Sequence, residues 1–421
     1  MNGKKIHVVE PIVRNLADID FDKLTMLYFV WSKFRWREVK FQSHNRETVP
    51  LLAYIDEQEL QFQLDRITKL KFPKWATAQL KRLYGHLFSD EFLSWLSELR
   101  LPRAQIEPIG AELLVKVTGT WPEVMLWETI AICVVNRLYL LAKMQELKLE
   151  EIYVMAEGHR RAEEKFKKRS SYPDLKFVDS GTYHRWSYEH EEVVLRTAMR
   201  MIPNPLKGTS NVLLGLRLGL PLIGTMAHEL PMAFQIIFWD EDEKSEWLVS
   251  QKKLWEMWEK FYGGALTIAL PDTYGNDFGL EDFKPFAAKW AGLRHDSGDP
   301  FEFGEKVIAF YNGIEIDPKE KMIVFSDGLT DETMIQLWER FHDRIKVDFW
   351  ETNLTNDMGY DVWLDGNRGL KPLSIVMQLV SVLSWFTMID TVNLSDDPEK
   401  RSGPYELRKR IIQKTSYKRI P

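Results

Sequence analysis

The chain has one cysteine in 421 residues, so no disulfide can form within it. Cys133 lies in the apolar run IAICVV, which predicts a buried structural thiol. The sequence lacks the patterns H-x-H, H-E-x-x-H and C-x-x-C, which argues against a histidine- or cysteine-rich metal centre. It also lacks low-complexity tracts and clear internal repeats. With 45% apolar residues and 16 tryptophans, the composition indicates a folded protein with a bulky core.

Long uncharged apolar runs are scarce. The run PLSIVMQLVSVLSWFTMI (372–389) carries no formal charge, but it contains Gln378 and several hydroxyl groups, so we favour a buried strand over a membrane span. The first residues, MNGKKIHVVEP, show no long apolar region followed by small residues, so we expect no secretory signal and a cytoplasmic protein. The net charge of −6 argues against a nucleic-acid-binding surface.

Strands and helices are expected to alternate over most of the chain. Before residue 120, helical patterns such as DFDKLTMLYFVWSKF (20–34) accompany a strand at 111–119, and 123–145 predict a long buried helix. From about residue 175, short apolar runs such as LKFVD, LPLIG and MIVF end in small, polar or charged residues, and mostly helical stretches follow. This alternation predicts a largely parallel sheet, open or closed. The polar clusters fall at the carboxyl ends of these strands, where closed α/β barrels carry their sites.

The segment GLRHDSGDP (292–300) concentrates charge at one of these strand ends. Asp296 and Asp299 can hold a hydrated Mg²⁺ or sugar hydroxyls, and Arg294 suits a phosphate or pyrophosphate. Because aspartate repels phosphate unless a cation or a sugar separates them, the mixture favours a substrate that carries both a sugar and a polyphosphate. The alternative is an aspartate cap and a turn before the helix EFGEKVIAFY.

Other segments leave chemistry and plain structure open. His228 in GTMAHE (224–229) can be a general base, a phosphate acceptor or a metal ligand, although a lone histidine is more often structural. GTSN (208–211) and SDG (326–328) can offer backbone N–H groups to an anion or form ordinary turns. The basic tail (400–419) favours a solvated helix over a polyanion contact.

Taken in order, these segments resemble the nicotinate phosphoribosyltransferase family over nearly the whole chain. GLRHDSGDP and GTMAHE are the specific matches, and the others support them. The remaining matching segments are LADIDFDKLTM (16–26), TGTWPEVMLWE (118–128), DSGTYHRWS (179–187), GTSN (208–211), VFSDGLT (324–330), TNLTND (352–357), KPLSIVMQLV (371–380) and LSDDPEK (394–400).

The resemblance implies an enzyme that joins nicotinate to 5-phosphoribosyl 1-pyrophosphate with Mg²⁺, giving nicotinate mononucleotide and pyrophosphate. ATP hydrolysis would drive the reaction through a phosphorylated histidine, which His228 matches. The implied fold is an irregular α/β barrel, similar to a TIM barrel, over residues 123–370. A second α+β domain would be formed by residues 1–122 and completed by about 371–421, and the protein would be a homodimer.

The resemblance also implies a set of substrate-binding residues. Asp296 and Asp299 would hold the metal, and Arg294 would stabilise the departing pyrophosphate. Ser210 stands where nicotinamide-using relatives have an aspartate; a serine can donate to the carboxylate of nicotinate, which an aspartate would repel. The other implied positions are Asp18, Lys23, Arg185, Thr225, Asp272, Ser297, Asp327, Gly328, Thr352 and Asn353.

The base pocket departs from the family pattern. The family shows DFGTRRR where this chain has DSGTYHR, so Ser180 stands where a phenylalanine is expected to stack on the pyridine ring. Tyr183 and His184 replace two arginines. Asp22 replaces a tyrosine that would cover the other side of the ring from the partner subunit. Because stacking on an aromatic is worth about 1–3 kcal/mol per base, these changes are expected to weaken pyridine binding tenfold or more.

The phosphate loop departs as well. FWET (349–352) replaces the family's F-G-I-G-T, so Trp350 and Glu351 stand where glycines are expected to let backbone N–H groups approach phosphate. Neighbouring rings could compensate for the lost stacking: Phe21, Tyr183 and Trp186 near the base, with Trp350 over the loop.

These observations support three hypotheses. The first is a nicotinate phosphoribosyltransferase with a remodelled ring pocket. The second is a phosphoribosyltransferase for a different base. The third is a catalytically weak relative that binds or regulates. A metal-dependent barrel hydrolase comes last, because its histidine ligand motifs are absent.

Overall fold

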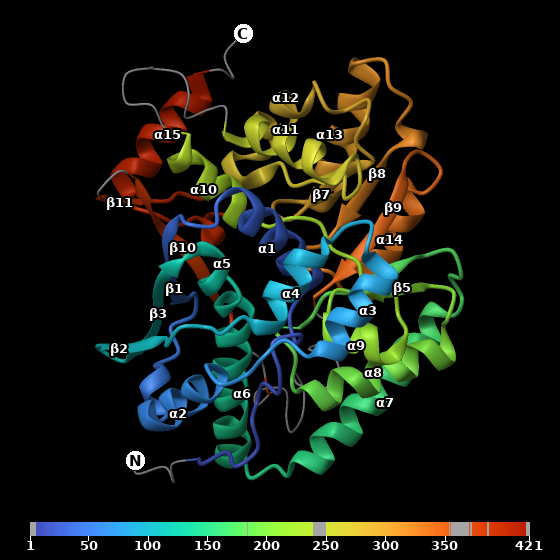
Figure 1. Cartoon of the computed structure of the whole chain (residues 1–421). Helices are drawn as coiled ribbons and strands as arrows, with labels where there is room; N and C mark the ends of the chain where they lie inside the picture. The colour runs from blue at the N-terminus through green and yellow to red at the C-terminus, as the bar shows by residue number, and fades with distance from the viewer. Residues whose placement is uncertain are drawn as a thin grey trace. The chain divides into compact units, whose positions relative to one another are not determined.

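The computed structural model describes residues 6–182, 184–238, 250–352, 354, 370, 373–384 and 387–417 (Figure 1). Two predicted site residues, Tyr183 and Asn353, lie outside these ranges. The chain forms two compact units. Unit 1 comprises Met1–Leu24, Phe41–Ile223 and Glu351–Gln378, and unit 2 comprises Thr25–Lys40, Gly224–Trp350 and Leu379–Pro421. A unit boundary falls within α1 (Phe21–Lys33), β1 (Glu38–Asn45), β9 (Lys346–Glu351) and β10 (Ile375–Ser384).

Unit 1 contains an antiparallel hairpin and a parallel strand pair. β2 (Gln105–Ile109) pairs antiparallel with β3 (Glu112–Thr120), which confirms the strand predicted at 111–119. β4 (Phe177–Asp179) and β5 (Leu206–Thr209) pair in parallel and are connected through α8 (Tyr188–Met201). Helices α7 and α8 lie side by side in Figure 1. The other helices are α2 (Glu57–Ile67), α3 (Lys74–Tyr84), α4 (Asp90–Glu98), α5 (Trp121–Val124), α6 (Trp127–Leu147), α7 (Glu151–Arg169) and α9 (Val212–Leu218).

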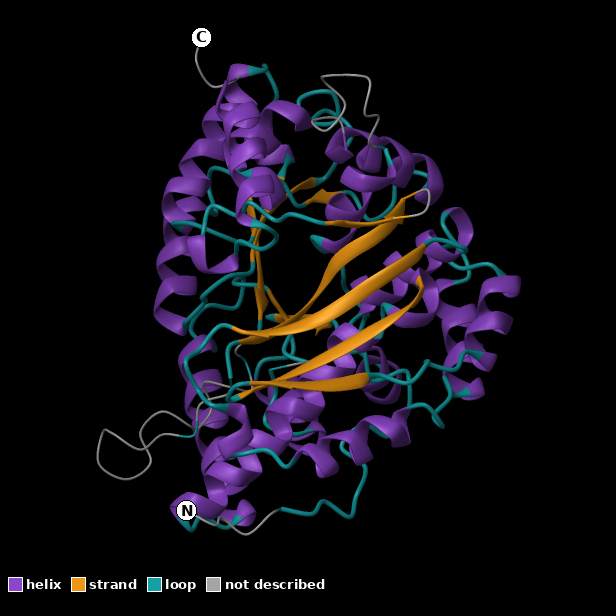
Figure 2. Ribbon diagram, turned by 90° about the vertical axis from the view of Figure 1, so that its left-hand side faces the viewer, coloured by secondary structure: helices purple, strands orange, loops and turns teal. Residues whose placement is uncertain are grey.

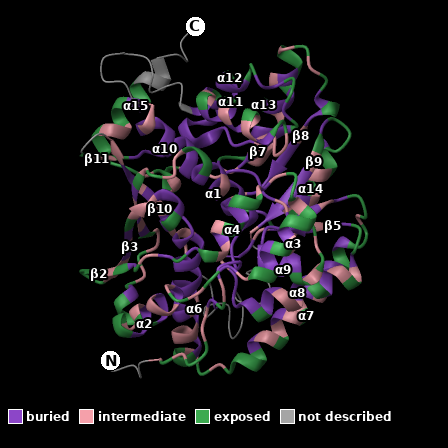
Figure 3. Ribbon diagram, viewed as in Figure 1, coloured by how far each residue is buried: buried purple, intermediate pink, exposed green. Residues whose placement is uncertain are grey.

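Helix α6 is the central core helix of unit 1. The stretch Trp121–Leu147 is long and apolar enough to cross a membrane, but 83% of its most apolar window is buried inside the protein, as Figure 3 shows for α6. The prediction of a long buried helix at 123–145 is therefore confirmed. Cys133 is buried on this helix, and its thiol donates to the Thr182 carbonyl at 3.2 Å.

Unit 2 contains a run of four parallel strands. β6 (Ile268–Ala269), β7 (Gly292–His295), β8 (Met322–Phe325) and β9 pair in that order, and Arg294 lies opposite Val324 in the register. Only glycine fits at position 292, because an added Cβ would lie 2.0 Å from the Met322 carbonyl oxygen. Figure 2 shows these strands in orange with helices in purple. The helices of unit 2 are α10 (Glu229–Ile237), α11 (Ser250–Tyr262), α12 (Asn276–Phe283), α13 (Pro300–Gly313), α14 (Asp331–Phe341) and α15 (Tyr405–Tyr417).

The uncharged run at 372–389 forms strands. β10 pairs antiparallel with β11 (Thr387–Asp390), from Ser381↔Asp390 to Ser384↔Thr387, so the predicted strand is confirmed. The basic tail is the helix α15, as predicted. The structure thus has a mixed α/β fold with both a parallel and an antiparallel sheet.

Polar residues at strand ends start the helices that follow. Ser187 accepts from the His190 amide to cap α8, and Asn211 accepts from the Leu214 amide to cap α9. The Asp299 carboxylate accepts from the amides of Phe301 and Glu302 at 2.8 and 2.9 Å, which caps α13. Such caps satisfy amides that the first helical turn leaves without partners. The aspartate-cap interpretation of GLRHDSGDP is therefore confirmed for Asp299.

One strand prediction is wrong. The run LPLIG before GTMAHE is a loop, in which Leu222 alone forms a parallel bridge with Thr209. The physical reason lies in the close approach at Gly208, where an added Cβ would be 2.2 Å from the Pro221 carbonyl oxygen. Pro221 also lacks an N–H for a ladder, so pairing does not propagate along this segment.

Candidate active site

Three titratable side chains of unit 2 converge at the carboxyl ends of β6 and β7. His228 immediately precedes α10, Asp272 begins the short 3₁₀ turn after β6, and Asp296 follows β7. The His228 Nε2 lies 3.1 Å from Asp296 Oδ2 and 3.8 Å from Asp272 Oδ1. Its Nδ1 lies 2.9 Å from the Thr273 hydroxyl. The imidazole is therefore fixed at both nitrogens, and one nitrogen faces two carboxylates.

Cations surround the Asp296 carboxylate. Arg294 donates from Nη2 to Asp296 Oδ1 at 3.0 Å and from Nε to the Ser326 hydroxyl at 2.9 Å. The Ser326 hydroxyl lies 3.0 Å from the same Asp296 oxygen and 2.7 Å from the His295 carbonyl. Lys400 donates to the Asp296 carbonyl and contacts the Asp327 carboxylate, both at 2.6 Å. The cluster thus places two permanent cations beside its acids, which suits an anionic ligand.

The charges in this cluster shift one another's proton affinity. Burial lowers the pKa of His228, but Asp272 and Asp296 outweigh burial and raise it. Burial raises the pKa of Asp272. Burial also acts to raise the pKa of Asp296, but Arg294, Lys400 and His228 hold it well below its usual range. His228 therefore holds its proton more tightly than an isolated histidine, and Asp296 stays ionised.

A second polar cluster lies in unit 1 at the carboxyl ends of β4 and β5. Arg185 donates to both oxygens of Asp18, at 2.8 and 2.5 Å, and to Glu191 at 2.7 Å. Thr182 and Ser210 both donate to Asp20 Oδ1, at 2.7 and 2.6 Å. Every one of these side chains is buried. In this structure the Arg185 guanidinium and the Ser210 hydroxyl therefore bind carboxylates of the protein itself.

Two protein-family models match this sequence. Residues 175–410 match the nicotinate phosphoribosyltransferase family (NAPRTase), and residues 17–136 match the N-terminal domain of that family. The chain belongs to the nicotinate phosphoribosyltransferase family. The family match covers more than half of the chain and includes both polar clusters, apart from Asp18 and Asp20, which the N-terminal domain match covers.

Solved structures of the family have the same fold. The nicotinate phosphoribosyltransferase of Porphyromonas gingivalis is 27% identical, with a TM-score of 0.85, and the match covers 96% of this chain and 100% of that one. The Vibrio cholerae nicotinate phosphoribosyltransferase is 25% identical, with a TM-score of 0.82 and 98% of both chains covered. A putative nicotinate phosphoribosyltransferase of Saccharomyces cerevisiae, at 24% identity and a TM-score of 0.82 over 98% of this chain and 100% of that one, shares the fold.

The positions that depart from the family pattern are engaged in local contacts. The Ser180 amide donates to the Glu351 carbonyl at 3.0 Å. Trp350 is buried, with the Arg294 guanidinium carbon 5.5 Å from its ring centroid. His184 donates its amide to Gly181, and an Asp22 oxygen accepts from the Lys23 amide. Trp350 therefore contacts the predicted pyrophosphate-binding arginine.

Glu351 is the centre of a buried ion-pair cluster in unit 1. Its carboxylate contacts Lys165 Nζ at 2.6 Å and both terminal nitrogens of Arg169, at 2.7 and 2.8 Å. Burial acts to raise the pKa of Glu351, but Arg169 and Lys165 outweigh it and lower the pKa to about 2. Glu351, the last residue of β9, thus forms ion pairs with helix α7.

The other predicted residues occupy varied positions. Thr225 and Ser297 are buried, and the Ser297 hydroxyl donates to Asp272 Oδ2 at 2.6 Å. Gly328 has a φ of +60°, a conformation that suits glycine, and Thr352 is half-buried. Lys23 is buried and forms an ion pair with Glu128 at 2.6 Å. This ion pair lies within unit 1.

Sequence reasoning missed the roles of Lys400, Ser326, Thr182 and Asp20. Lys400 is 104 positions from Asp296 along the chain, so no local spacing connects the two. Lys400 is the last residue of LSDDPEK, one of the segments that resemble the family. That resemblance was the signal from which a role for Lys400 could have been predicted. Asp20 matches the family pattern in LADIDFDKLTM together with Asp18 and Lys23, and Thr182 lies in the matched segment DSGTYHRWS, but neither was named as a site residue.

Mg²⁺ is the metal that the family implies, and the acidic group fits it in part. The ligand atoms of His228, Asp272 and Asp296 all lie within 4.8 Å of one another. Among the described residues, the buried Asp272 Oδ1 forms no hydrogen bond, so it is an oxygen available to a hard cation. The predicted ligand Asp296 belongs to this group. The other predicted ligand, Asp299, does not, and its Oδ1 caps α13.

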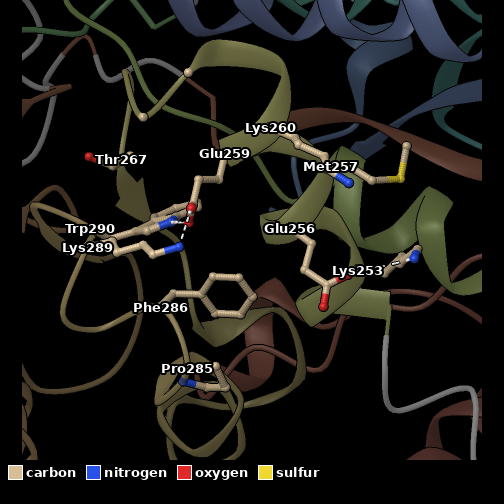
Figure 4. A pocket seen from close by; sticks show the side chains of 12 residues that line it. Lys253, Glu256, Met257, Glu259, Lys260, Thr267, Pro285, Phe286, Lys289 and Trp290 are labelled. Atoms are coloured by element: carbon tan, nitrogen blue, oxygen red, sulfur yellow. Dashed lines mark hydrogen bonds and ion pairs between the residues drawn. The ribbon is translucent and has the colours of Figure 1, made fainter.

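A surface pocket of about 650 Å³ lies elsewhere in unit 2 (Figure 4). It is lined by residues of α11 and of the 285–290 segment, and Glu259 accepts there from Lys289 and from the Trp290 indole, both at 3.0 Å. None of the described residues that line it is a predicted site residue.

Neutralising one carboxylate tests the electrostatics of His228 directly. Asp272→Asn removes a charge that raises the His228 pKa, so the imidazole should titrate at a lower pH than in the unsubstituted protein. Histidine-selective NMR, recorded with a chelator to remove divalent ions, measures this pKa, and His228→Ala assigns the signal. Asp317→Asn, at the exposed cap of a 3₁₀ turn, is the control and should leave the titration unchanged. An unchanged His228 pKa in Asp272→Asn would contradict the electrostatic coupling.

Proposed function

We propose that this enzyme joins nicotinate to 5-phosphoribosyl 1-pyrophosphate, producing nicotinate mononucleotide and pyrophosphate in pyridine nucleotide salvage, and that ATP hydrolysis through His228 drives the reaction. The observation that supports this most is the His228 imidazole, which Thr273 holds at Nδ1 and Asp296 at Nε2. A nucleophilic histidine needs such an orienting partner and a nearby proton acceptor. Family membership supports the substrate class.

In this proposal the cations of unit 2 stabilise the leaving group. Breaking the bond between C1 of the ribose and the pyrophosphate leaves positive charge on the sugar and negative charge on the pyrophosphate. Arg294 presents a fixed guanidinium, since Ser326 and Asp296 orient two of its nitrogens. Lys400 adds a second cation, which donates to the Asp296 carbonyl at 2.6 Å. Fixed charges of this kind lower the barrier because they need no reorganisation during the reaction.

Phosphoryl transfer to His228 requires an unprotonated imidazole nitrogen. Its raised pKa means that the attacking nitrogen must first release its proton to solvent, while Asp296, 3.1 Å from Nε2, stays ionised and orients the ring. Mg²⁺, when bound at Asp272 and Asp296, would neutralise phosphate charge. Asp299 remains a proposed metal ligand through its second oxygen.

The remaining features of the proposal follow the family. Ser210 would donate to the nicotinate carboxylate, and Asp18, Lys23, Arg185, Thr225, Ser297, Asp327, Gly328, Thr352 and Asn353 would complete the substrate contacts. The parallel strands would belong to an irregular α/β barrel over 123–370, with a second domain from 1–122 and about 371–421. We also propose a cytoplasmic homodimer.

Mononucleotide formation with different bases tests this function. The purified protein is incubated with 5-phosphoribosyl 1-pyrophosphate, Mg²⁺ and ATP, and with nicotinate, nicotinamide or another base. Product from nicotinate alone is the expected result. Product from another base alone would identify a phosphoribosyltransferase for that base, which Ser180 and Asp22 would then explain as a reshaped ring pocket. If no base reacts while the sugar donor still binds, the protein is a binding or regulatory relative.

A further inference from the structure

The run Thr209-Ser210-Asn211 at the end of β5 distributes its side chains among three buried acids. Thr209 donates to Asp179 at 2.7 Å, Ser210 donates to Asp20 at 2.6 Å, and Asn211 donates to Asp18 at 3.0 Å. The carboxyl ends of parallel strands are where α/β proteins bind their ligands. Ser210, the proposed contact of the nicotinate carboxylate, lies at such a strand end, but it donates its only hydroxyl hydrogen to Asp20.

A hydroxyl can donate one hydrogen bond and accept two. While Ser210 donates to an ionised Asp20, its oxygen can only accept from a ligand. Once Asp20 is protonated, the acid can donate to the Ser210 oxygen, and the Ser210 hydrogen is free to turn to a ligand. The protonation state of one carboxyl group thus decides whether Ser210 presents an acceptor or a donor.

We propose that Asp20 is a positioning residue that selects between acid and amide substrates at Ser210. This inference rests on the proposed function. Neutral Asp20 lets Ser210 donate to the carboxylate of nicotinate, whereas ionised Asp20 makes Ser210 an acceptor for the N–H of an amide such as nicotinamide. No covalent bond to carbon changes: binding of nicotinate to the ionised form takes up one proton from solvent, and that proton resides on Asp20.

The surroundings of Asp20 keep its pKa close to neutral pH, so both protonation states are accessible. Thr182 donates to the same oxygen as Ser210 and fixes its position. Other acids bind the nearby cations: Arg185 donates to Asp18 and Glu191, and Lys23 is paired with Glu128. The neighbouring Asp179 carboxylate accepts from Thr209. Burial, followed by the charge of Asp22, raises the pKa of Asp20 to about 7, against the lowering effect of the Ser210 and Thr182 hydrogen bonds and with a further rise from Glu191.

Steady-state kinetics across pH test the proposal. Between about pH 6 and about pH 9 nicotinate keeps a single charge, so a change in its KM reports the enzyme. We expect the KM for nicotinate to rise by up to tenfold per pH unit above about 7, with kcat little changed, since each unit depletes the neutral form of Asp20 tenfold. The preference for nicotinate over nicotinamide in kcat/KM should fall by the same factor.

Two variants separate this role from a structural one. Asp20→Asn cannot titrate, so its KM for nicotinate should be independent of pH over this range. Asp22→Asn removes a charge that raises the Asp20 pKa, so the rise in KM should begin at a lower pH while keeping its slope. A structural role alone would lower activity equally at every pH without moving the profile. Thermal melting of each variant checks folding.

Proton uptake gives a readout that does not depend on turnover. Calorimetric titration of nicotinate into the unsubstituted protein, in two buffers with different ionisation enthalpies, should show uptake of up to one proton at about pH 8.5 and none at about pH 6. A flat KM profile in a protein that makes nicotinate mononucleotide would overturn the inference and leave the proposed function standing. Absence of the mononucleotide at every pH would overturn both.

Discussion

Replacing His228 with alanine should abolish the stimulation of mononucleotide formation by ATP. The imidazole is the nucleophile in the proposed phosphoryl transfer, and among the described residues no other histidine lies in the group formed with Asp272 and Asp296. A positioned acid, base or nucleophile contributes roughly 10²- to 10⁴-fold to a rate, so the ATP-dependent component should fall below detection. The slower, ATP-independent reaction should persist, because Arg294 and Lys400 are unchanged.

Two measurements check this result. The rate of product formation is compared with and without ATP, and incorporation of labelled γ-phosphate into acid-labile phosphohistidine is followed in the same samples. His342→Ala is the matched control, since His342 is an exposed histidine of unit 2 that stacks on Trp338. ATP stimulation that survives in His228→Ala would remove this residue from the coupling mechanism.

Replacing Glu351 with glutamine should destabilise the protein by about 3–5 kcal/mol, because removing one member of a buried ion-pair cluster leaves its partners uncompensated. Glu351 and Arg169 are buried, with 0% and 2% side-chain exposure, and Lys165 is nearly so, with 8% of its side chain exposed. The cost is a large fraction of the free energy of unfolding of a typical domain. Denaturant unfolding, monitored by tryptophan fluorescence, measures it.

Glu305→Gln provides the control. Glu305 also lies between two arginines, Arg340 and Arg344, but 39% of its side chain is exposed. Hydrogen bonds from these arginines lower the pKa of Glu305 to about 2, the same value as for Glu351. Solvent screens the exposed pair, so this substitution should cost less than about 1 kcal/mol. Equal losses of unfolding free energy in the two variants would show that burial does not determine the cost of removing the carboxylate.

The pH dependence of the Glu351 contribution follows from its lowered pKa. The pKa of Glu351 is lowered from 4.5 to about 2 in the folded protein. The stabilisation by the ionised carboxylate is therefore complete above about pH 4.5 and is lost as the pH falls towards 2. Glu351→Gln should lack this part of the acid-induced loss of stability. The structural role of Glu351 is therefore to form the ion pairs with Lys165 and Arg169 of α7.

Local sequence patterns predicted the elements well where hydrophobic periodicity was long or a cap was present. The helix at 123–145, the strand at 111–119, the strand within 372–389 and the Asp299 cap all follow from residues close together in the chain. The predicted strand LPLIG failed because Pro221 and the tight approach at Gly208 limit pairing to a single bridge. Close backbone packing of this kind involves residues far along the chain, and no window of the sequence contains it.

The sequence was sufficient to indicate the family and to name His228, Arg294 and Asp296 as candidate site residues, because their motifs are compact and specific. Only the tertiary structure decided their partners: Lys400 beside Asp296, Asp20 beneath Ser210, and Lys165 and Arg169 around Glu351. Hydrogen bonds and ion pairs act over a few ångströms in space, whereas these partners are 104 to 190 positions apart in the chain. Their protonation and orientation are properties of the folded surroundings, which burial and neighbouring charge set together.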